Sequence, residues 1–131
     1  MEKGRRKSGR LQVFKGRKAK LNHAIFHILA LKGPLTIYDV YKRVRTRRLL
    51  KRTRYATVNK RVRSLEESGY IKKIGIRKTK AGFGAAIYEL AAKAYLATML
   101  DSIDLEDIIM RVDEATASAI IAAIAYTTES S

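Results

Sequence analysis

The chain of 131 residues contains no cysteine, one proline and two histidines. Without cysteine it can have neither a disulfide framework nor a thiolate metal site. Its longest apolar run, Ala115 to Tyr126, is interrupted by Thr116 and Ser118 and is too short to span a bilayer. The N-terminus lacks the apolar stretch of a signal peptide. We therefore expect a cytoplasmic, nucleoid-associated protein without a membrane segment.

The residue groupings that carry catalysis or bind metals are also missing. No Ser/His/Asp set stands in a recognisable context, and the acids of 104–114 recur at helical spacing, which is typical of a solvated face. His23 and His27 share one face of a predicted helix but lack a third ligand for zinc. We expect no enzyme activity, no metal and no cofactor.

Acidic residues are scarce in the first hundred positions. These hold 27 Lys and Arg against five acids, a formal charge of +22, whereas residues 101–131 hold one Arg and seven acids, a formal charge of −6. A basic excess of this size indicates a polyanionic partner. Nucleic acid is the first candidate. An anionic membrane surface is a weaker one, because the basic helices place their apolar stripes in one core.

The basic excess is greatest between Tyr41 and Arg63, a stretch with no acid in which eleven of 23 residues are Lys or Arg. Apolar residues still recur there at helical spacing, including Val44, Val58 and Val62. A charged tail would not need such spacing. The pattern predicts a folded surface that meets a polyanion.

Three helices are predicted before residue 70. The first spans about 20–32 and ends at Gly33-Pro34. The second spans 36–46, with Thr36 as N-cap and Asp39 three residues later in a variant capping box. A connection over 47–52 leads to the third helix, 53–68, which we expect Thr53 to cap and Gly69 to end.

The third helix has two different faces. At 100° per residue, Val58, Val62 and Leu65 share the buried side. The opposite side holds Ala56, Asn59, Lys60 and Arg63, flanked by Thr57 and Arg61. Asn can pair with adenine, Arg with guanine, and Ala or Thr can meet a thymine methyl. The outward face is therefore suited to reading base edges.

The period changes to two after Gly69, which predicts strands over 70–78 and 85–90 joined by a turn at 80–84. A helix over about 91–100 follows, and Asp101 or Ser102 is expected to cap the next one. Asp113 then starts a helix to about Tyr126 that is apolar nearly all round. Because such a helix should be buried, we expect a homodimer through Leu105, Ile108, Ile109, Val112, Ile120, Ile121 and Ile124.

The segments 35–44 (LTIYDVYKRV), 53–71 (TRYATVNKRVRSLEESGYI) and 86–90 (AIYEL) resemble a winged helix-turn-helix domain of the MarR-like, PadR-like and archaeal winged-helix regulators. The resemblance covers about residues 20–100 and departs from the usual pattern in the long link 46–53. It implies a winged helix-turn-helix fold with a two-stranded hairpin wing, and the helices predicted after it make the whole chain mostly α (α+β) with additional C-terminal helices. Residues 1–19, with eight Lys and Arg and three Gly, are expected to be a flexible basic arm, and 101–131 a dimerisation segment.

The resemblance also implies site residues. Helix 53–68 would lie in the major groove and the wing, 77–84, would touch the DNA backbone. Base reading would fall to Arg54, Tyr55, Thr57, Asn59, Lys60 and Arg63. Phosphate contacts would fall to Lys42, Arg43, Arg47, Arg48, Lys51, Arg52, Arg61, Arg77, Lys78 and Lys80.

We therefore expect a sequence-specific regulator of transcription that binds double-stranded DNA. Two alternatives stay open. One is an RNA-binding or ribosome-associated protein, although few aromatic residues offer a stacking surface for single strands. The other is a non-specific chromatin or replication protein, which would share the fold and differ in its specificity ratio.

Overall fold

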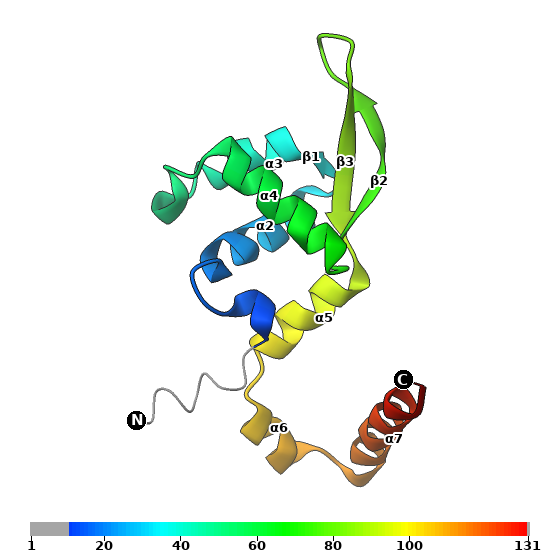
Figure 1. Ribbon diagram of the computed structural model, residues 1–131. Helices are drawn as coiled ribbons and strands as arrows, with labels where there is room; N and C mark the ends of the chain where they lie inside the picture. The colour runs from blue at the N-terminus through cyan, green and yellow to red at the C-terminus, as the bar shows by residue number, and fades with distance from the viewer. Residues whose placement is uncertain (1–10, 131) are drawn as a thin grey trace. The chain divides into compact units, whose positions relative to one another are not determined.

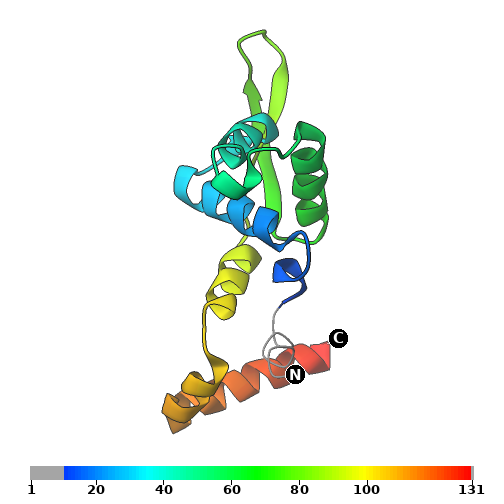
Figure 2. The ribbon, with the colours of Figure 1, turned by 90° about the vertical axis from the view of Figure 1, so that its left-hand side faces the viewer.

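The computed structural model describes residues 11–130, and the chain divides into two compact units, 1–101 and 102–131 (Figure 1). The first unit contains the helices α2 (Ala19–Lys32), α3 (Ile37–Val44), α4 (Tyr55–Glu67) and α5 (Ala92–Asp101). Its strands are β1 (Leu35–Thr36), β2 (Ile71–Lys78) and β3 (Gly84–Leu90). Helices α2, α3 and α4 pack together, and the β2–β3 hairpin extends away from them (Figures 1 and 2).

The core of the first unit lies between these three helices and the base of the sheet. Ile25 of α2, Val44 of α3 and Val58 of α4 are fully buried. Burying a side chain of this kind contributes about 1.5–3 kcal/mol each. The predicted inner face of the third helix is confirmed, because Val62 and Leu65 are buried with Val58. This packing fixes which face of α4 points outward.

Helix boundaries follow local capping, with one correction. The Oγ1 atom of Thr36 accepts a hydrogen bond of 3.1 Å from the backbone N–H of Asp39, as predicted. The predicted cap at Thr53 is wrong: Arg54 occupies the N-cap position of α4 in extended conformation. The N–H of Thr53 instead donates to the carbonyl of Leu50, after the short 3-10 helix η2 (Arg48–Leu50). Thr53 therefore belongs to the connection.

The sheet has three strands where the sequence predicted two. Its order is β1-β3-β2, all antiparallel, with Leu35 opposite Tyr88 and Ile71 opposite Leu90. An irregularity in β2 between Lys73 and Gly75 shifts the register against β3. The short strand β1 ties the start of α3 to the base of the hairpin. The mostly helical winged helix-turn-helix architecture is otherwise as predicted.

The basic arm predicted over 1–19 is too long. Residues 1–10 lie outside the described residues, but the short helix η1 (Gln12–Phe14) packs on the first unit. Phe14 is 1% exposed, and its ring stacks on His23 with centroids 4.0 Å apart. Asn22 Nδ2 donates to the carbonyl of Val13 at 2.8 Å. Residues 11–14 are therefore part of the folded unit.

The second unit contains α6 (Leu105–Arg111) and α7 (Glu114–Ser130). Asp104 caps α6 by accepting from the N–H groups of Glu106 and Asp107, so the predicted cap at Asp101 or Ser102 is wrong. Asp113 Oδ1 accepts from the N–H of Thr116 at 2.7 Å, and this bond lowers the pKa of the Asp113 carboxyl. No helix within residues 11–130 is long and apolar enough to cross a membrane.

Candidate nucleic-acid interface

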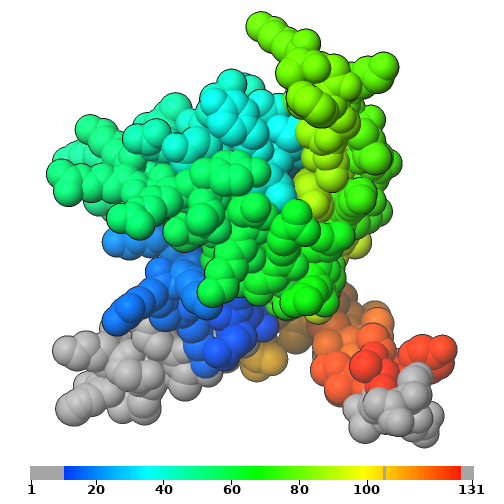
Figure 3. Space-filling view, turned by 45° about the horizontal axis from the view of Figure 1, so that its top comes forward, coloured from blue at the N-terminus to red at the C-terminus, as the bar shows by residue number. Residues whose placement is uncertain are grey.

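The outward face of α4 carries the residues predicted to read bases. Arg54, Tyr55, Thr57, Lys60 and Arg63 are exposed, and Asn59 is half-buried. Arg54 and Tyr55 stand at the start of the helix, and the others follow along its outer side. Figure 3 shows α3, the connection after it and α4 on one face, with the hairpin projecting at the edge. The face can therefore meet a large partner.

Two residues of this face act together. Arg63 Nε donates to Asn59 Oδ1 at 2.8 Å, one helical turn away. This hydrogen bond ties the Arg63 guanidinium to the Asn59 side chain, whose amide oxygen is the acceptor. Arg63 is exposed and has further N–H donors besides Nε, which suits guanine or a phosphate. Arg63 uses one of the two lone pairs of Asn59 Oδ1, so pairing of Asn59 with adenine would share that oxygen with Arg63.

The hairpin completes a groove beside α4. A cavity of about 580 Å³ is lined by Tyr38 and Asp39 of α3, Tyr55 and Arg63 of α4, and residues of the wing that include Arg77, Lys78 and Lys80. The tip of the wing is ordered by the N–H of Thr79, which donates to the carbonyl of Phe83 at 2.7 Å. Folding thus brings Arg63 and Lys78 to one groove from separate elements.

Several predicted phosphate contacts have partners within the protein. Arg77 forms an ion pair with Asp39, which ties the wing to the start of α3. Arg47 is half-buried, and its Nη2 lies 2.7 Å from His27 Nδ1. Seven of the predicted phosphate contacts are exposed: Lys42, Arg43, Arg48, Lys51, Arg52, Lys78 and Lys80. The exposed set can approach phosphates directly, whereas Arg47 and Arg77 must first leave their partners.

Arg61 lies apart from the groove. It is half-buried, its Nη2 donates to Ser64 Oγ at 2.8 Å, and burial lowers the pKa of its guanidinium from the ordinary value. It lines a cavity with Asn22 and Lys93, not the groove that contains Arg63. Helical rotation predicted that Arg61 flanks the base-reading face. In the structure it lies on the opposite side of α4 from the groove beside the wing.

An aromatic cluster beside α4 was not anticipated. The rings of Tyr38, Tyr41 and Tyr55 lie 5.5–6.4 Å apart between centroids. The Lys42 ammonium stands 5.1 Å from the centre of the Tyr38 ring. Tyr38 and Tyr41 are three residues apart, so they share a helix face. The spacing in the sequence could have indicated the pair Tyr38 and Tyr41. Tyr55 joins them only because α3 packs on α4.

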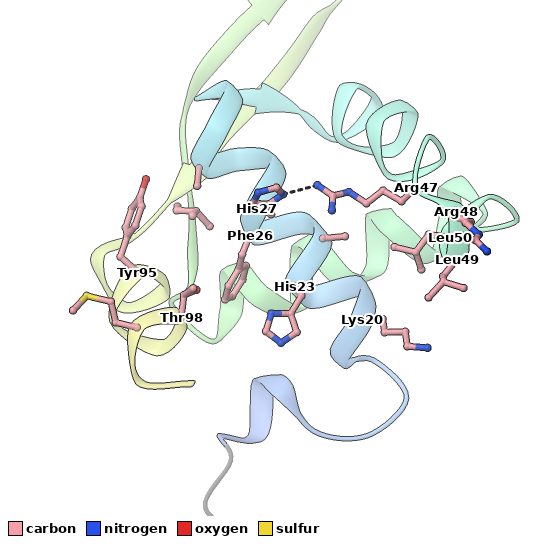
Figure 4. Close-up of a pocket in the computed structure, with 14 residues that line it drawn as sticks. Lys20, His23, Phe26, His27, Arg47, Arg48, Leu49, Leu50, Tyr95 and Thr98 are labelled. Carbon is pink, nitrogen blue, oxygen red and sulfur yellow. Dashed lines mark hydrogen bonds between the residues drawn. The ribbon is translucent and has the colours of Figure 1, made fainter. Parts of the chain in front are cut away.

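A further cavity, of about 720 Å³, lies between α2, η2 and α5 (Figure 4). Its lining is largely apolar and includes Phe26, Leu50 and Met99, with Lys20 and Arg48 among the basic members. The dashed line in Figure 4 joins Arg47 to His27, which with His23 also lines the cavity. No group of three metal-ligating side chains occurs among the residues that the structure describes.

The second unit presents apolar side chains. Ile109 is 70% exposed and Ile121 66% exposed, and Ile120 and Ile124 are also exposed. Ile108 and Val112 are half-buried, and the side chain of Leu105 lies outside the description. Within this unit, α6 and α7 thus leave most of the predicted dimer residues accessible.

The fold has known counterparts. Neither a protein-family model nor a curated protein sequence matches the chain. Diamide-treated YodB from B. subtilis is similar in structure, with a TM-score of 0.52 and 15% identity over 78% of this chain and 87% of YodB. Bacillus subtilis PadR in complex with operator DNA is similar with a TM-score of 0.51 and 18% identity over 88% of this chain. The chain spans 62% of the PadR chain. The chain has the winged helix-turn-helix fold.

Proposed function

We propose that this protein binds double-stranded DNA sequence-specifically and regulates transcription. The observation that carries the proposal is the groove between α4 and the wing, where Arg63 and Lys78 line one cavity. A helix with an exposed polar face beside a basic hairpin matches the major groove and the adjoining backbone of a duplex. The PadR structure that resembles this chain contains operator DNA, which supports the same use of the fold.

In this proposal, base edges are read by Arg54, Tyr55, Thr57, Asn59, Lys60 and Arg63. Phosphates are contacted by Lys42, Arg43, Arg48, Lys51, Arg52, Lys78 and Lys80. Arg47 and Arg77 also contact phosphates, after they exchange His27 and Asp39 for phosphate oxygens. The formal charge of +22 over residues 1–100 would speed association and make affinity fall with salt. The protein would act at the nucleoid as a binding protein, not as an enzyme.

Footprinting on genomic fragments at moderate salt tests sequence specificity. We expect discrete protected sites, with affinity at least about 10³-fold above that for random duplex. Uniform coverage of all fragments would contradict the regulator and favour a non-specific chromatin or replication protein.

The tyrosine cluster favours a second candidate function, binding of RNA with unpaired bases. Aromatic faces beside basic residues stack single-stranded bases, at about 1–3 kcal/mol per base. Tyr38 is 55% exposed and Tyr55 41% exposed. Competition between duplex DNA and structured RNA at matched salt separates the two candidates. The RNA function requires tighter binding to RNA, and a loss of that binding in Tyr38→Ala.

A further inference from the structure

A second basic cavity, of about 400 Å³, lies on the side of α4 that carries Arg61. Segments far apart in the sequence enclose it: η1 and the residues after it, α2, the end of α4, and α5. Its volume falls in the range of small-molecule sites. Because all its lining residues belong to the first unit, the cavity is a feature of one folded body.

Positive charge converges on this cavity. Lys15, Lys18, Arg61 and Lys93 line it, and no acid is among the described residues of its lining. Lys93 Nζ also donates to the carbonyl of Ser68, at the end of α4, and lies 4.7 Å from the centre of the Tyr70 ring. These contacts hold Lys93 beside the cavity. Four like charges around one space repel each other unless an anion occupies it.

Two side chains that line the cavity each have a buried polar atom without a hydrogen-bond partner among the described residues: Arg61 Nε and Asn22 Oδ1. Both side chains are nonetheless fixed, because Arg61 Nη2 donates to Ser64 and Asn22 Nδ2 donates to Val13. Asn22 is only 4% exposed. An unpaired buried donor and an unpaired buried acceptor destabilise the fold unless a bound molecule meets them.

We infer that this cavity binds a phosphate group, carried by a small phosphate monoester that also has a hydroxyl. The phosphate oxygens accept from Arg61 Nε, and the lysines balance a charge of about −1.5 to −2. The hydroxyl donates to Asn22 Oδ1, an acceptor that the deprotonated phosphate oxygens cannot satisfy. A lone carboxylate would neutralise only one of the four cations.

A nucleic-acid backbone also offers phosphate groups, but as diesters of one negative charge each and, in DNA, without a free sugar hydroxyl, so the two sources, a free monoester and a backbone, give different outcomes. Isothermal titration of the full chain at constant ionic strength tests the first source, with ribose 5-phosphate as the probe. We expect saturable binding at one site, weaker binding of inorganic phosphate, which lacks the sugar hydroxyls, and no binding of ribose. Arg61→Gln should weaken binding at least tenfold.

Lys18→Gln provides a second variant, because Lys18 is exposed and its replacement leaves the core intact. It should weaken binding about threefold. Lys73→Gln is the matched control, with the same change in charge at an exposed strand residue outside the cavity. It should leave the affinity unchanged. Equal losses in Lys18→Gln and Lys73→Gln would overturn the site, because net charge alone would then explain binding.

The second source is tested by the salt dependence of duplex DNA binding. If the probe does not bind but Lys18→Gln or Arg61→Gln lowers the salt slope by about one unit, the cavity receives a backbone phosphodiester and the inference of a monoester site is wrong. If the probe does not bind and the slope is unchanged in both variants, the inference is wrong. Titration of the free ligand needs no DNA, so it can succeed even where footprinting shows no DNA binding.

Discussion

At the scale of single residues, the bond between Arg63 and Asn59 determines what the outer face of α4 can offer. The carboxamide oxygen of Asn59 is engaged, so Arg63 is the better-placed reader. We predict that Arg63→Ala weakens binding to a preferred site by about 1–3 kcal/mol and relaxes preference at one base position. The measurement compares the affinity for the preferred DNA site with the affinities for sites in which each base pair is replaced by each of the other three.

The wing should behave differently because a phosphate contact carries no base information. We predict that Lys78→Ala weakens binding to all duplexes alike and lowers the salt slope by about one unit. Titrations at several salt concentrations measure the slope. If Arg63→Ala and Lys78→Ala have the same effect on random and preferred duplexes, the division between reading and positioning is wrong.

The sequence predicts which side of α4 is buried but not what approaches the other sides. Helical rotation correctly places Val58 inside and Lys60 and Arg63 outside. It cannot show that Arg47 meets His27, twenty residues earlier, or that Arg77 meets Asp39. Such partners depend on how helices and hairpin pack. Charge counting therefore overestimates the number of cations that are available to a partner.

At the scale of elements, Thr36 links two structures. Its hydroxyl caps α3, and its backbone pairs with Ile87 in the sheet. We predict that Thr36→Ala lowers the free energy of unfolding by about 1 kcal/mol, because the N–H of Asp39 loses its acceptor. Urea unfolding measures the change. Thr36→Ser keeps the hydroxyl and should lose less than half as much; equal losses would point to the methyl group.

Elements with strong periodicity are predictable, and those that depend on distant pairing are not. Helices α2, α3 and α4 lie close to their predicted ranges. Strand β1 has two residues, too few for an alternating pattern, and it pairs with residues about fifty positions later. Helix η1 has only three residues, too few for a helical period, yet Phe14 is buried in the core. Its burial depends on α2, which the local sequence does not reveal.

For the whole molecule, the contrast in charge and exposure between the two units underlies the proposed assembly. The first unit has its own core and a strongly basic composition, whereas residues 102–131, with one Arg and six acids, carry a formal charge of −5. Within the second unit, Ile109, Ile120 and Ile121 are exposed. Exposed apolar surface of this kind marks an interaction site. We propose that it pairs two copies, whose α4 helices would then lie about 34–36 Å apart on a palindrome.

Deletion of residues 102–131 tests this assembly. We predict that the full chain is a dimer and the shortened chain a monomer by light scattering, because the removed helices carry the proposed interface. The monomer should keep its fold by circular dichroism, since none of the described residues of its core lies beyond Ala97. It should still bind a single half-site but lose the preference for two half-sites one helical turn apart. A shortened chain that remains dimeric would place the interface on the first unit.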